Sequence, residues 1–526
     1  MSLAPPPCDE GVIRRARPLA PCEASSEPWI IAAAAAGSGM AFLDSTVLNV
    51  ALPAIQADLG ATASETQWVY GSFALVVAAL LLVGGSLGDH LGRKRVYALG
   101  VALFGAASAW SAFAAGPGQL IAARAIKGAG GALMVPGALA IIGASFGEER
   151  RTRAIGLWSA LSGLAMAVGP VLGGLLVENA SWRLAFLINP PVAALVLVVV
   201  LRHVPESRDP AAGRLDFAGA ALATLGLGGL VYGLIRAPQA GFVDPLTLLS
   251  LGLGVGGLAL FVLAEGRGRY PMMPLSLFGS RTFDGASLYT LFFYVALTAS
   301  LYLVPFLMVQ VHGHPATVAG AVFLPFVAAA LLFGRLSAGI VGRYGLRTPL
   351  VVASLATALG FLLFAVPGAD GAAPHWSAFV PAMVAQGFGM ALVIAPLTTA
   401  ALDSVEGDHA GLASGVNNAV ARTAGLLAVA VFGIVLYAAF STNLDARVAD
   451  LPLSADEFAS LQEEKTKLGA AQPPKGVDAA TAERIEHAVA ESFVAGFRMV
   501  MFLAAGLALV SAAVGAILIG EYSDPW

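Results

Sequence analysis

The sequence predicts an all-α integral membrane protein whose helices cross the bilayer many times. Charged residues make up only 12% of the chain, and hydrophobic residues make up 58%. Average soluble domains carry roughly 25% charged residues, so this chain has too few charges to cover a surface that faces water. The net charge of −4 is small, and the chain lacks a basic domain or tail that would indicate a nucleic-acid partner.

About fourteen apolar runs have the length of a membrane span, since about 20 apolar residues cross the roughly 30 Å hydrocarbon core. They lie at 29–52, 66–88, 96–115, 118–146, 154–177, 183–202, 215–236, 245–264, 283–309, 316–341, 349–367, 376–402, 412–440 and 493–520.

Basic residues cluster in every second predicted loop, and this alternation predicts the orientation of the protein in the membrane. If the N-terminus is cytoplasmic, the interior loops hold Arg93–Arg95, the arginines of 150–153 and most other bases. The short exterior loops hold only Arg183, with Arg236 at a helix end. This positive-inside bias predicts a multi-pass protein of the cytoplasmic membrane with both termini inside the cell.

The distribution of spans predicts two six-helix bundles plus two extra central helices. The expected regions are a disordered cytoplasmic tail (1–28), an N-terminal six-helix bundle (29–202), a two-helix insert with its linkers (203–281) and a C-terminal six-helix bundle (282–526).

Segment 441–490 is expected to form an extracellular loop within the C-terminal bundle. Ser454 and Glu457 have the spacing of a capping box. Residues 472–476 would end one amphipathic stretch before Asp478 to Glu491 begins another. Two interpretations stay open: an external gate, or a solvated hairpin that only connects two spans.

Residues 85–95, which read GSLGDHLGRKR, place an acid and three bases in a glycine-rich turn between two apolar runs. A degenerate copy at Ala338–Arg347 follows another long apolar run and has Gly342 at the position of Asp89. Many transporters are built from two such halves. Because the second copy lacks the acid, an interaction that depends on Asp89 has no counterpart there.

Three charged residues lie well inside predicted spans, where a charge costs at least about 2.5–3.5 kcal/mol and usually faces a cavity or a partner. Asp44 is in the first span, and Arg124 and Lys127 share one face of the fourth. Antiparallel spans bring them to a similar depth. The pattern indicates a carboxyl group that could switch between protonated and ionised forms, or else a static ion pair that fixes helix packing.

Three further bases lie in spans of the second half. Arg335 and Arg498 are close enough to a helix end for their head groups to reach water. Arg422 lies near the middle of its span, so it is a candidate for binding an anionic group or for pairing with backbone near Gly425.

The fifth span carries a glycine–proline pattern comprising Gly169, Pro170, Gly173 and Gly174. Proline removes a backbone hydrogen bond and allows a bend. Small residues around it permit close approach of a neighbouring helix.

Together these motifs resemble the fourteen-helix drug:proton antiporter branch of the major facilitator superfamily, over essentially the whole chain after residue 28. The matching segments are Leu43–Thr46 with Ala51–Pro53, Gly85–Lys94, Arg124 with Gly128, Gly169-Pro170, Ser181–Arg183 with Phe186–Pro191, and Gly411–Asn418. The resemblance implies the major facilitator fold and the export of lipophilic, often cationic compounds in exchange for protons.

The resemblance also implies roles for individual residues. Proton coupling falls to Asp44 and Arg124, the conformational latch to the 85–95 loop, and the antiporter bend to the fifth span. The residues of the latch are Gly85, Asp89, Gly92 and Arg93, and those of the antiporter motif are Gly169, Pro170, Gly173 and Gly174. No cofactor is implied, because the proton serves as the coupling ion.

The chain departs from the family pattern at Lys127, where glutamine is usual, and at His90, where arginine is usual. An added positive charge beside Asp44 could compete with Arg124 or favour a less cationic or anionic substrate.

From the sequence as a whole we expect a monomeric multidrug exporter acting on lipophilic small molecules. The alternatives are a dedicated exporter of one metabolite or antibiotic and, from another class, a non-transporting membrane sensor. An enzyme is not expected, because the sequence shows no nucleophile–base or metal-ligand cluster.

Overall fold

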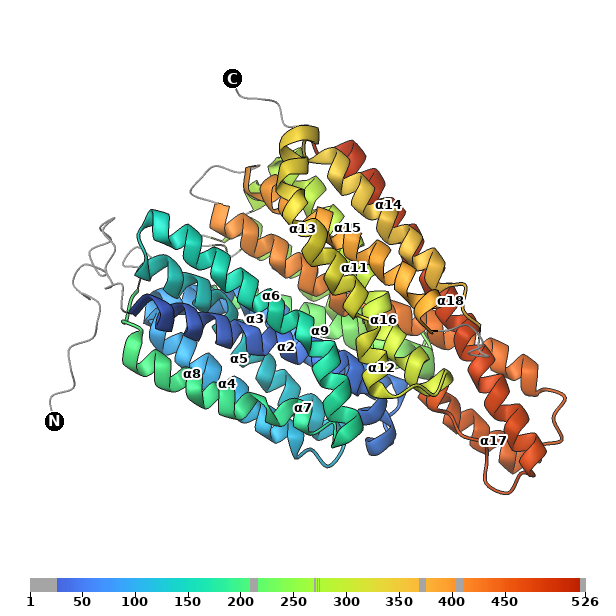
Figure 1. Cartoon of the computed structure of the whole chain (residues 1–526). Helices are drawn as coiled ribbons and strands as arrows, with labels where there is room; N and C mark the ends of the chain where they lie inside the picture. Colours follow the sequence, from blue (N-terminus) through green and yellow to red (C-terminus); the bar gives the residue numbers. More distant parts are fainter. Residues whose placement is uncertain are drawn as a thin grey trace. The chain divides into compact units, whose positions relative to one another are not determined.

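The computed structural model describes residues 26–208, 216–268, 271, 273, 275–368, 375–403 and 410–520. Within these ranges every regular element is a helix (Figure 1). The elements are α2 (Glu27–Leu59), α3 (Ala63–Leu91), α4 (Arg93–Ala112), α5 (Pro117–Ser145), α6 (Glu148–Asn179), α7 (Leu184–Leu187), α8 (Asn189–His203), α9 (Phe217–Ala240), α10 (Pro245–Arg267), η2 (Leu275–Gly279), α11 (Arg281–Phe306), η3 (Leu307–Val311), α12 (Ala316–Ala321), α13 (Leu324–Tyr344), α14 (Arg347–Phe364), α15 (His375–Asp403), α16 (Ala410–Val448), α17 (Ala455–Glu464), η5 (Lys465–Ala470) and α18 (Ala479–Leu518). The expected tail lies outside the described residues, apart from its last three.

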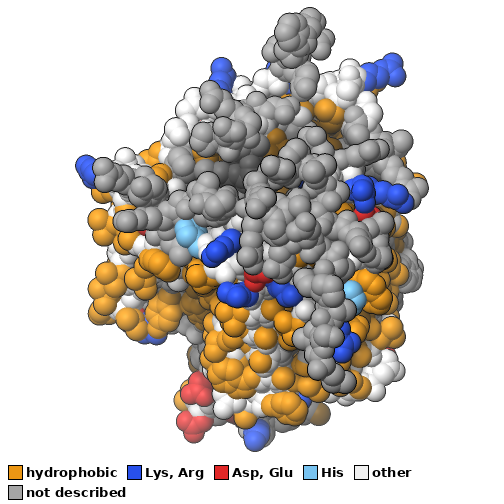
Figure 2. Space-filling view, turned by 90° about the vertical axis from the view of Figure 1, so that its left-hand side faces the viewer, with side chains coloured by type: hydrophobic (Ala, Val, Ile, Leu, Met, Phe, Trp, Pro, Cys, Tyr) orange, Lys and Arg blue, Asp and Glu red, His pale blue; other side chains and the backbone are white. Residues whose placement is uncertain are grey.

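Twelve helices of the described chain are long and apolar enough to cross a membrane, and the bent helix α3 makes up to thirteen. Figure 2 shows hydrophobic side chains over much of one face, with scattered charged groups. The prediction of a multi-pass helical membrane protein is confirmed, whereas the count of fourteen is not. A helix occupies each of the fourteen expected positions, but α4 is not among the candidates. It begins with Arg93, Lys94 and Arg95, and small residues dominate the rest.

The helices divide into two compact units. The first comprises Met1–Ala51, Val69–Leu227 and Gly257–Met272, and the second comprises Leu52–Trp68, Gly228–Gly256 and Met273–Trp526. The end of α2 and the start of α3 therefore group with the second unit, as do the adjoining ends of α9 and α10.

In the first unit, α4 and α5 pack in close contact through glycines. A Cβ atom added to Gly130 would lie 2.7 Å from the backbone nitrogen of Phe104 and 2.8 Å from the carbonyl oxygen of Gly100. Real Cβ atoms do not approach so closely, so the contact requires glycine. Tyr97, Phe104 and Met134 fill the buried core around this seam.

In the second unit, α14 and α15 also pack in close contact through glycines. A Cβ atom on Gly360 would lie 2.9 Å from the carbonyl oxygen of Ala382, and one on Gly389 would lie 2.7 Å from that of Ala353. Tyr289, Phe293 and Leu350 belong to the buried core of this unit. In both units the third and fourth predicted spans thus pack through glycine.

The two copies of the turn motif share a backbone feature at corresponding positions. Gly92 joins α3 to α4 with a φ of 113°, and Gly345 joins α13 to α14 with a φ of 69°. Residues with a Cβ rarely adopt positive φ, so both turns favour glycine. The common geometry supports the proposed repeat even though Gly342 replaces Asp89.

Helices occupy most of segment 441–490, in keeping with the capping box and the two amphipathic stretches expected in this connecting loop. Helix α16 continues to Val448, and α18 begins at Ala479 and runs without a break into its apolar part. Asp478 caps α18 by accepting hydrogen bonds from the backbone of Ala480 and Thr481, both at 3.0 Å. The capping box of Ser454 and Glu457 is confirmed at the start of α17.

Candidate functional site

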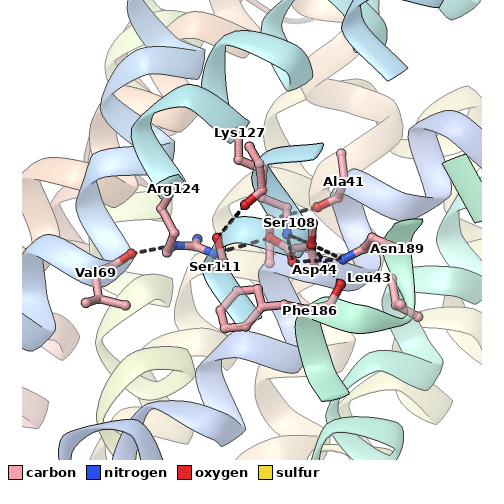
Figure 3. A network of polar contacts seen from close by, with 12 residues as sticks. Ala41, Leu43, Asp44, Val69, Ser108, Ser111, Arg124, Lys127, Phe186 and Asn189 are labelled. Atoms are coloured by element: carbon pink, nitrogen blue, oxygen red, sulfur yellow. Dashed lines mark hydrogen bonds and ion pairs between the residues drawn. The ribbon is translucent and has the colours of Figure 1, made fainter. Parts of the chain in front are cut away.

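The structure brings Asp44, Arg124 and Lys127 together in the interior of the first unit (Figure 3). Asp44 lies on α2, and the two bases lie on one face of α5. The Arg124 Nη1 atom is 3.3 Å from Asp44 Oδ2, and the Lys127 ammonium forms an ion pair with Asp44 Oδ1. All three residues are almost completely buried, with exposed fractions of 2%, 1% and 0% respectively. The predicted contact is confirmed, and Lys127 is a full member of it.

Two neutral residues that were not predicted complete this cluster. Ser108 on α4 accepts a hydrogen bond from Lys127 Nζ at 2.8 Å and another from Asn189 Nδ2 at 3.0 Å. The same Asn189 amide, at the start of α8, lies 3.3 Å from Asp44 Oδ1. Asn189 had been noted only as part of a family-like segment. We call these five residues, Asp44, Ser108, Arg124, Lys127 and Asn189, the charge cluster.

Backbone and aromatic groups hold Arg124 in place. Its Nε atom donates a 2.5 Å hydrogen bond to the carbonyl oxygen of Val69 on α3. Its guanidinium carbon lies 5.2 Å from the ring centre of Phe73 and 5.9 Å from that of Phe186. Cation–π contacts at such distances stabilise a desolvated cation. The arginine is therefore fixed on three sides, and Asp44 is only one of its partners.

The charge cluster contains one carboxylate and two bases. Burying an ion is expensive unless an opposite charge and hydrogen bonds compensate for lost water. Asp44 compensates for one base but not for two, so the fully ionised cluster carries a buried net charge of +1. Buried charge inside a membrane helix bundle usually marks a substrate or ion pathway rather than a structural feature.

The antiporter motif packs against the turn of α2 that carries Asp44. A Cβ atom added to Gly169 would collide with the hydroxyl oxygen of Thr46. One added to Gly173 would lie 2.9 Å from the carbonyl oxygen of Val47. Pro170 and Gly174 are also buried, and α6 is continuous through the proline. The glycines let α6 approach α2 beside the carboxylate.

Of the residues predicted to form the latch, Asp89, Gly92 and Arg93 lie at the junction of α3 and α4, and Gly85 lies within α3. Arg93 and Asp89 make a salt bridge of 2.8 Å. Glu206, which sequence reasoning missed, accepts a 3.1 Å hydrogen bond from the backbone nitrogen of Lys94. A Cβ atom on Gly92 would strike the Glu206 carboxylate, whereas one on Gly85 would only touch Pro136 at 3.6 Å. Glu206, which follows α8 in the chain, thus packs against this turn.

The remaining predicted bases lie in the second unit. Arg498 donates hydrogen bonds to the carbonyl oxygens of Val366 and Pro367, at 3.3 and 3.1 Å, just beyond the end of α14. Arg422 is half-buried on α16. The side chain of Arg335 lies outside the part of the structure that is described. Among the described residues, no group of histidines, cysteines and acids has the arrangement of a metal site.

A buried charge cluster in a multi-pass helical protein is typical of membrane transporters, where such groups mark a substrate or ion pathway. The comparison with known families makes the class specific. The model of the Major Facilitator Superfamily matches residues 34–430, so the chain belongs to that superfamily. It is accordingly a transporter and not an enzyme.

Curated relatives of the chain are resistance and export proteins. It is 36% identical over 417 residues to the multidrug resistance protein Stp of Mycobacterium tuberculosis, covering 78% of this chain and 76% of Stp. It is 31% identical over 491 residues to the tetracenomycin C resistance and export protein of Streptomyces glaucescens, covering 93% and 91%. The probable actinorhodin transporter of Streptomyces coelicolor is 35% identical, covering 78% and 72%. The chain is thus related to multidrug and antibiotic exporters.

Solved structures show the fold. An auto-inhibited peptide transporter of the POT family superposes with a TM-score of 0.64 and 16% identity, covering 95% of this chain and 99% of that one. A bacterial homologue of the human lysosomal transporter Spinster gives a TM-score of 0.60 and 17% identity, with 94% and 98% covered. At such low identity these likenesses establish only that the chain has the fold of this superfamily.

Proposed function

We propose that the protein is a proton-coupled antiporter that exports lipophilic small molecules across the cytoplasmic membrane by alternating access. The observation that carries this proposal is the buried carboxylate of Asp44, held by Arg124 and Lys127. A lone acid among bases, shielded from water, is a group whose proton occupancy changes the forces between helices. The export relatives supply the direction of transport.

The geometry suggests how proton binding would act. The ionised carboxylate accepts hydrogen bonds from both bases on α5 and from Asn189 on α8. A proton on Asp44 would cancel the charge that holds α2 to these helices. Because Gly169 and Gly173 pack against the adjacent turn of α2, a movement of that turn would be transmitted directly to α6. Proton binding and helix rearrangement would then be coupled.

The test replaces Asp44 with asparagine, which keeps the shape of the side chain but removes its charge and its proton. In proteoliposomes with an imposed pH gradient, Asp44→Asn should lose gradient-driven accumulation of a fluorescent lipophilic compound, so that the final internal level equals that of protein-free vesicles. The exposed Asp456 on α17 provides a matched control, since Asp456→Asn should transport like the unmodified protein.

A second measurement distinguishes coupling from folding. Asp44→Asn should still exchange the compound between the two sides down its own gradient, and its melting temperature should show that it folds. Undiminished pH-driven accumulation by this variant would eliminate the proposal. Loss of both activities together with a low melting temperature would instead favour a static ion pair.

A dedicated exporter of one antibiotic is the second candidate. It is favoured by relatives whose names refer to single compounds, tetracenomycin C and actinorhodin. A growth screen of an overexpressing strain against structurally varied antibiotics, with and without a protonophore, separates the two. Protection against several unrelated classes indicates a multidrug exporter, and protection against one class indicates a dedicated one.

We further propose fourteen spans, cytoplasmic termini and a monomeric state. The only two cysteines of the chain, Cys8 and Cys22, lie in the N-terminal tail. A membrane-impermeant maleimide should therefore label inside-out vesicles and leave intact cells unlabelled. Labelling of intact cells would reverse the assigned orientation.

A further inference from the structure

We propose that a pocket at the junction of α2 and α3, beside the end of α11, is the exit of the transport path, and that Leu468 of η5 is the plug that closes it. The inference rests on the proposed export function and on the proposed orientation, which puts the pocket at the outer face. Of the two interpretations of segment 441–490, it favours the external gate. It is carried by the lining of the pocket, by the backbone of the plug and by the hydrogen bonds that hold η5 to α2.

The lining of the pocket suits an uncharged, lipophilic compound. The rings of Tyr302, Phe306 and Phe493 contribute apolar surface, and the amides of Gln56 and Gln67 contribute polar groups. None of the described residues that line the pocket is charged, and all of them belong to the second unit. Mostly apolar walls with a few polar groups are typical of sites that bind small molecules.

Leu468 closes this pocket from the side of η5. Its side chain lines the pocket and is only 7% exposed. Its φ of 55° is the single positive value among the described residues other than glycine. Positive φ strains a residue that has a Cβ atom, and such strain persists only where the surroundings hold it in place. The strain is released when η5 leaves the pocket, so it lowers the cost of opening.

Two amide hydrogen bonds hold η5 against the end of α2. Gln56 Nε2 donates to the carbonyl oxygen of Lys467 at 3.0 Å. Gln56 Oε1 accepts a bond of 3.0 Å from Gln310 Nε2. Gln56 is only 3% exposed, so water has little access to either bond. Neutral hydrogen bonds contribute modestly to stability. This lock can therefore open and close in every transport cycle.

Gln310 comes from an irregular turn at the end of α11. Its segment, η3, is a π-helix. Such turns are rare and are frequently found at functional sites. The buried Oε1 atom of Gln310 has no hydrogen-bond partner among the described residues. It packs against Gly469 of η5, where an added Cβ atom would lie 3.0 Å away. This oxygen is an acceptor that is available to water or to a passing compound when η5 lifts.

Helix α2 joins this lock to the charge cluster. Asp44 and Gln56 lie about 18 Å apart along its axis. The division between the two units falls between Ala51 and Leu52, next to Pro53. Proline inside a helix removes a backbone hydrogen bond and allows a bend. The end of α2 can therefore part from η5 by bending at the proline, while the turn that carries Asp44 stays in the first unit.

The first experiment tests the plug and needs no transported compound. Cys8 and Cys22, the only two cysteines of the chain, are replaced by serine, and Gln67→Cys then places a single thiol in the pocket. A membrane-impermeant maleimide should label this thiol slowly in intact cells. Adding Leu468→Ala should speed the labelling roughly tenfold, because the closed state loses most of the burial of a leucine side chain. An unchanged rate would overturn the proposal.

A second substitution at the same position separates the side chain from the backbone. Leu468→Gly also removes the side chain, but glycine adopts positive φ without strain. Both variants should therefore label faster than the parent with Leu468. Fast labelling in Leu468→Ala with the parent rate in Leu468→Gly would show that backbone strain opens the pocket, and the leucine would not be the plug. Melting temperatures show whether both variants fold.

The second experiment tests whether η5 must leave α2 during transport. In the cysteine-free background, Gln56→Cys and Lys467→Cys are joined by a short, reducible bis-methanethiosulfonate reagent. The joined protein should lose pH-driven accumulation of a fluorescent lipophilic compound in proteoliposomes, and reduction should restore it. The matched control joins Arg447→Cys and Glu491→Cys, whose native side chains form a 2.9 Å salt bridge between α16 and α18. The joined control should accumulate the compound as before.

The outcomes separate the gate from the function on which it rests. If the unmodified and cysteine-free proteins show no pH-driven accumulation, the proposed function fails. If both accumulate the compound and the joined Gln56–Lys467 pair does so too, η5 does not part from α2 and the gate is excluded. Equal loss in the joined Arg447–Glu491 control also excludes it, because any tether would then block transport. Labelling of Gln67→Cys only in inside-out vesicles would place the pocket at the inner face and refute the exit.

Discussion

The two units place buried polar side chains on corresponding spans, but the cluster in the first unit is charged, whereas the contacts compared with it in the second unit are neutral. In the first unit, the first, third, fourth and sixth predicted spans contribute the charge cluster. In the second unit, Ser300 on α11 donates to Gln386 on α15 at 2.8 Å. Ser354 on α14 bonds with Tyr289 on α11 and Ser511 on α18, both at 2.8 Å. These are also the first, third, fourth and sixth spans of their half.

The difference separates two purposes of a buried polar contact. Both units need hydrogen bonds to fix the register of neighbouring helices, and neutral side chains meet that need at modest cost. Ionised groups in the same places cost much more. The charges of the first cluster are in keeping with the proposed coupling role. The contacts of Ser300 with Gln386 and of Ser354 with Tyr289 and Ser511, which we call the neutral seam, need only a structural role.

The largest effect is expected from a methyl group added at Gly169. Gly169→Ala should push Thr46 and the Asp44 turn away from α6, which should abolish gradient-driven transport and cost about 1–3 kcal/mol of stability through overpacking. Transport assays and thermal unfolding of the same preparation measure both quantities.

The second unit supplies the matched control for this substitution. Gly425, on the fifth span, faces Thr298 on the first, and an added Cβ atom would lie at an ordinary 3.4 Å from the threonine hydroxyl. Gly425→Ala should therefore be tolerated, and Thr46→Ala should restore part of the activity of Gly169→Ala. Equal damage by both glycine variants would show that α6 has no special relation to the charge cluster.

A smaller effect is expected from the neutral seam. Gln386→Leu removes the hydrogen bond with Ser300, but it also removes an amide nitrogen that has no partner among the described residues. The two changes have opposite effects on stability. Without Gln386, the Ser300 hydroxyl can donate its proton to the carbonyl oxygen of Leu297, which lies at 3.1 Å. Stability should change by less than about 1 kcal/mol. The transport rate should fall only modestly, with the number of protons exchanged per cycle (the proton number) unchanged. A changed proton number would mean that the second unit also takes part in coupling.

Sequence reasoning found the charged members of the site and missed the neutral ones for a physical reason. A charge in an apolar span is so costly that Asp44, Arg124 and Lys127 indicate their own importance. Ser108 and Asn189 carry no such penalty, and serine is common in membrane helices because it bonds to its own backbone. Only the pairing of α4 and α8 with α5 in space selects them.

For the fold, as for the site, the sequence predicted some features and missed others. Apolar runs located a helix at each expected position, because spanning a bilayer leaves few alternatives to a helix. Segment 441–490 was harder, since its helices extend beyond the apolar runs and are stabilised by caps at Ser454 and Asp478. The turns at Gly92 and Gly345 were predicted correctly from the repeated motif. The hydrogen bond of Glu206 to the backbone of Lys94 was not predicted, because it joins residues more than a hundred positions apart.

The smallest effect is expected from a substitution in an aspartate–arginine pair outside the charge cluster. This substitution tests whether such a pair is sufficient for proton coupling. Asp244, just before α10, forms a 3.0 Å salt bridge with Arg236. That hydrogen bond and those from Thr247 lower the pKa of Asp244 to about 2. A lowered pKa adds stability that is complete above the ordinary pKa of 3.8 and is lost as the pH falls toward 2. Asp244 therefore stays ionised wherever transport is measured.

Asp244→Asn should accordingly leave the pH profile and the proton number of transport unchanged, in contrast to Asp44→Asn. The comparison is strict because both substitutions remove one carboxylate that faces an arginine. They differ in burial, because water reaches Asp244 and does not reach Asp44, and in the second base, which only Asp44 has. A shifted pH profile in Asp244→Asn would show that an arginine–aspartate pair near the end of a span suffices for coupling, and that burial between two bases is not the deciding property.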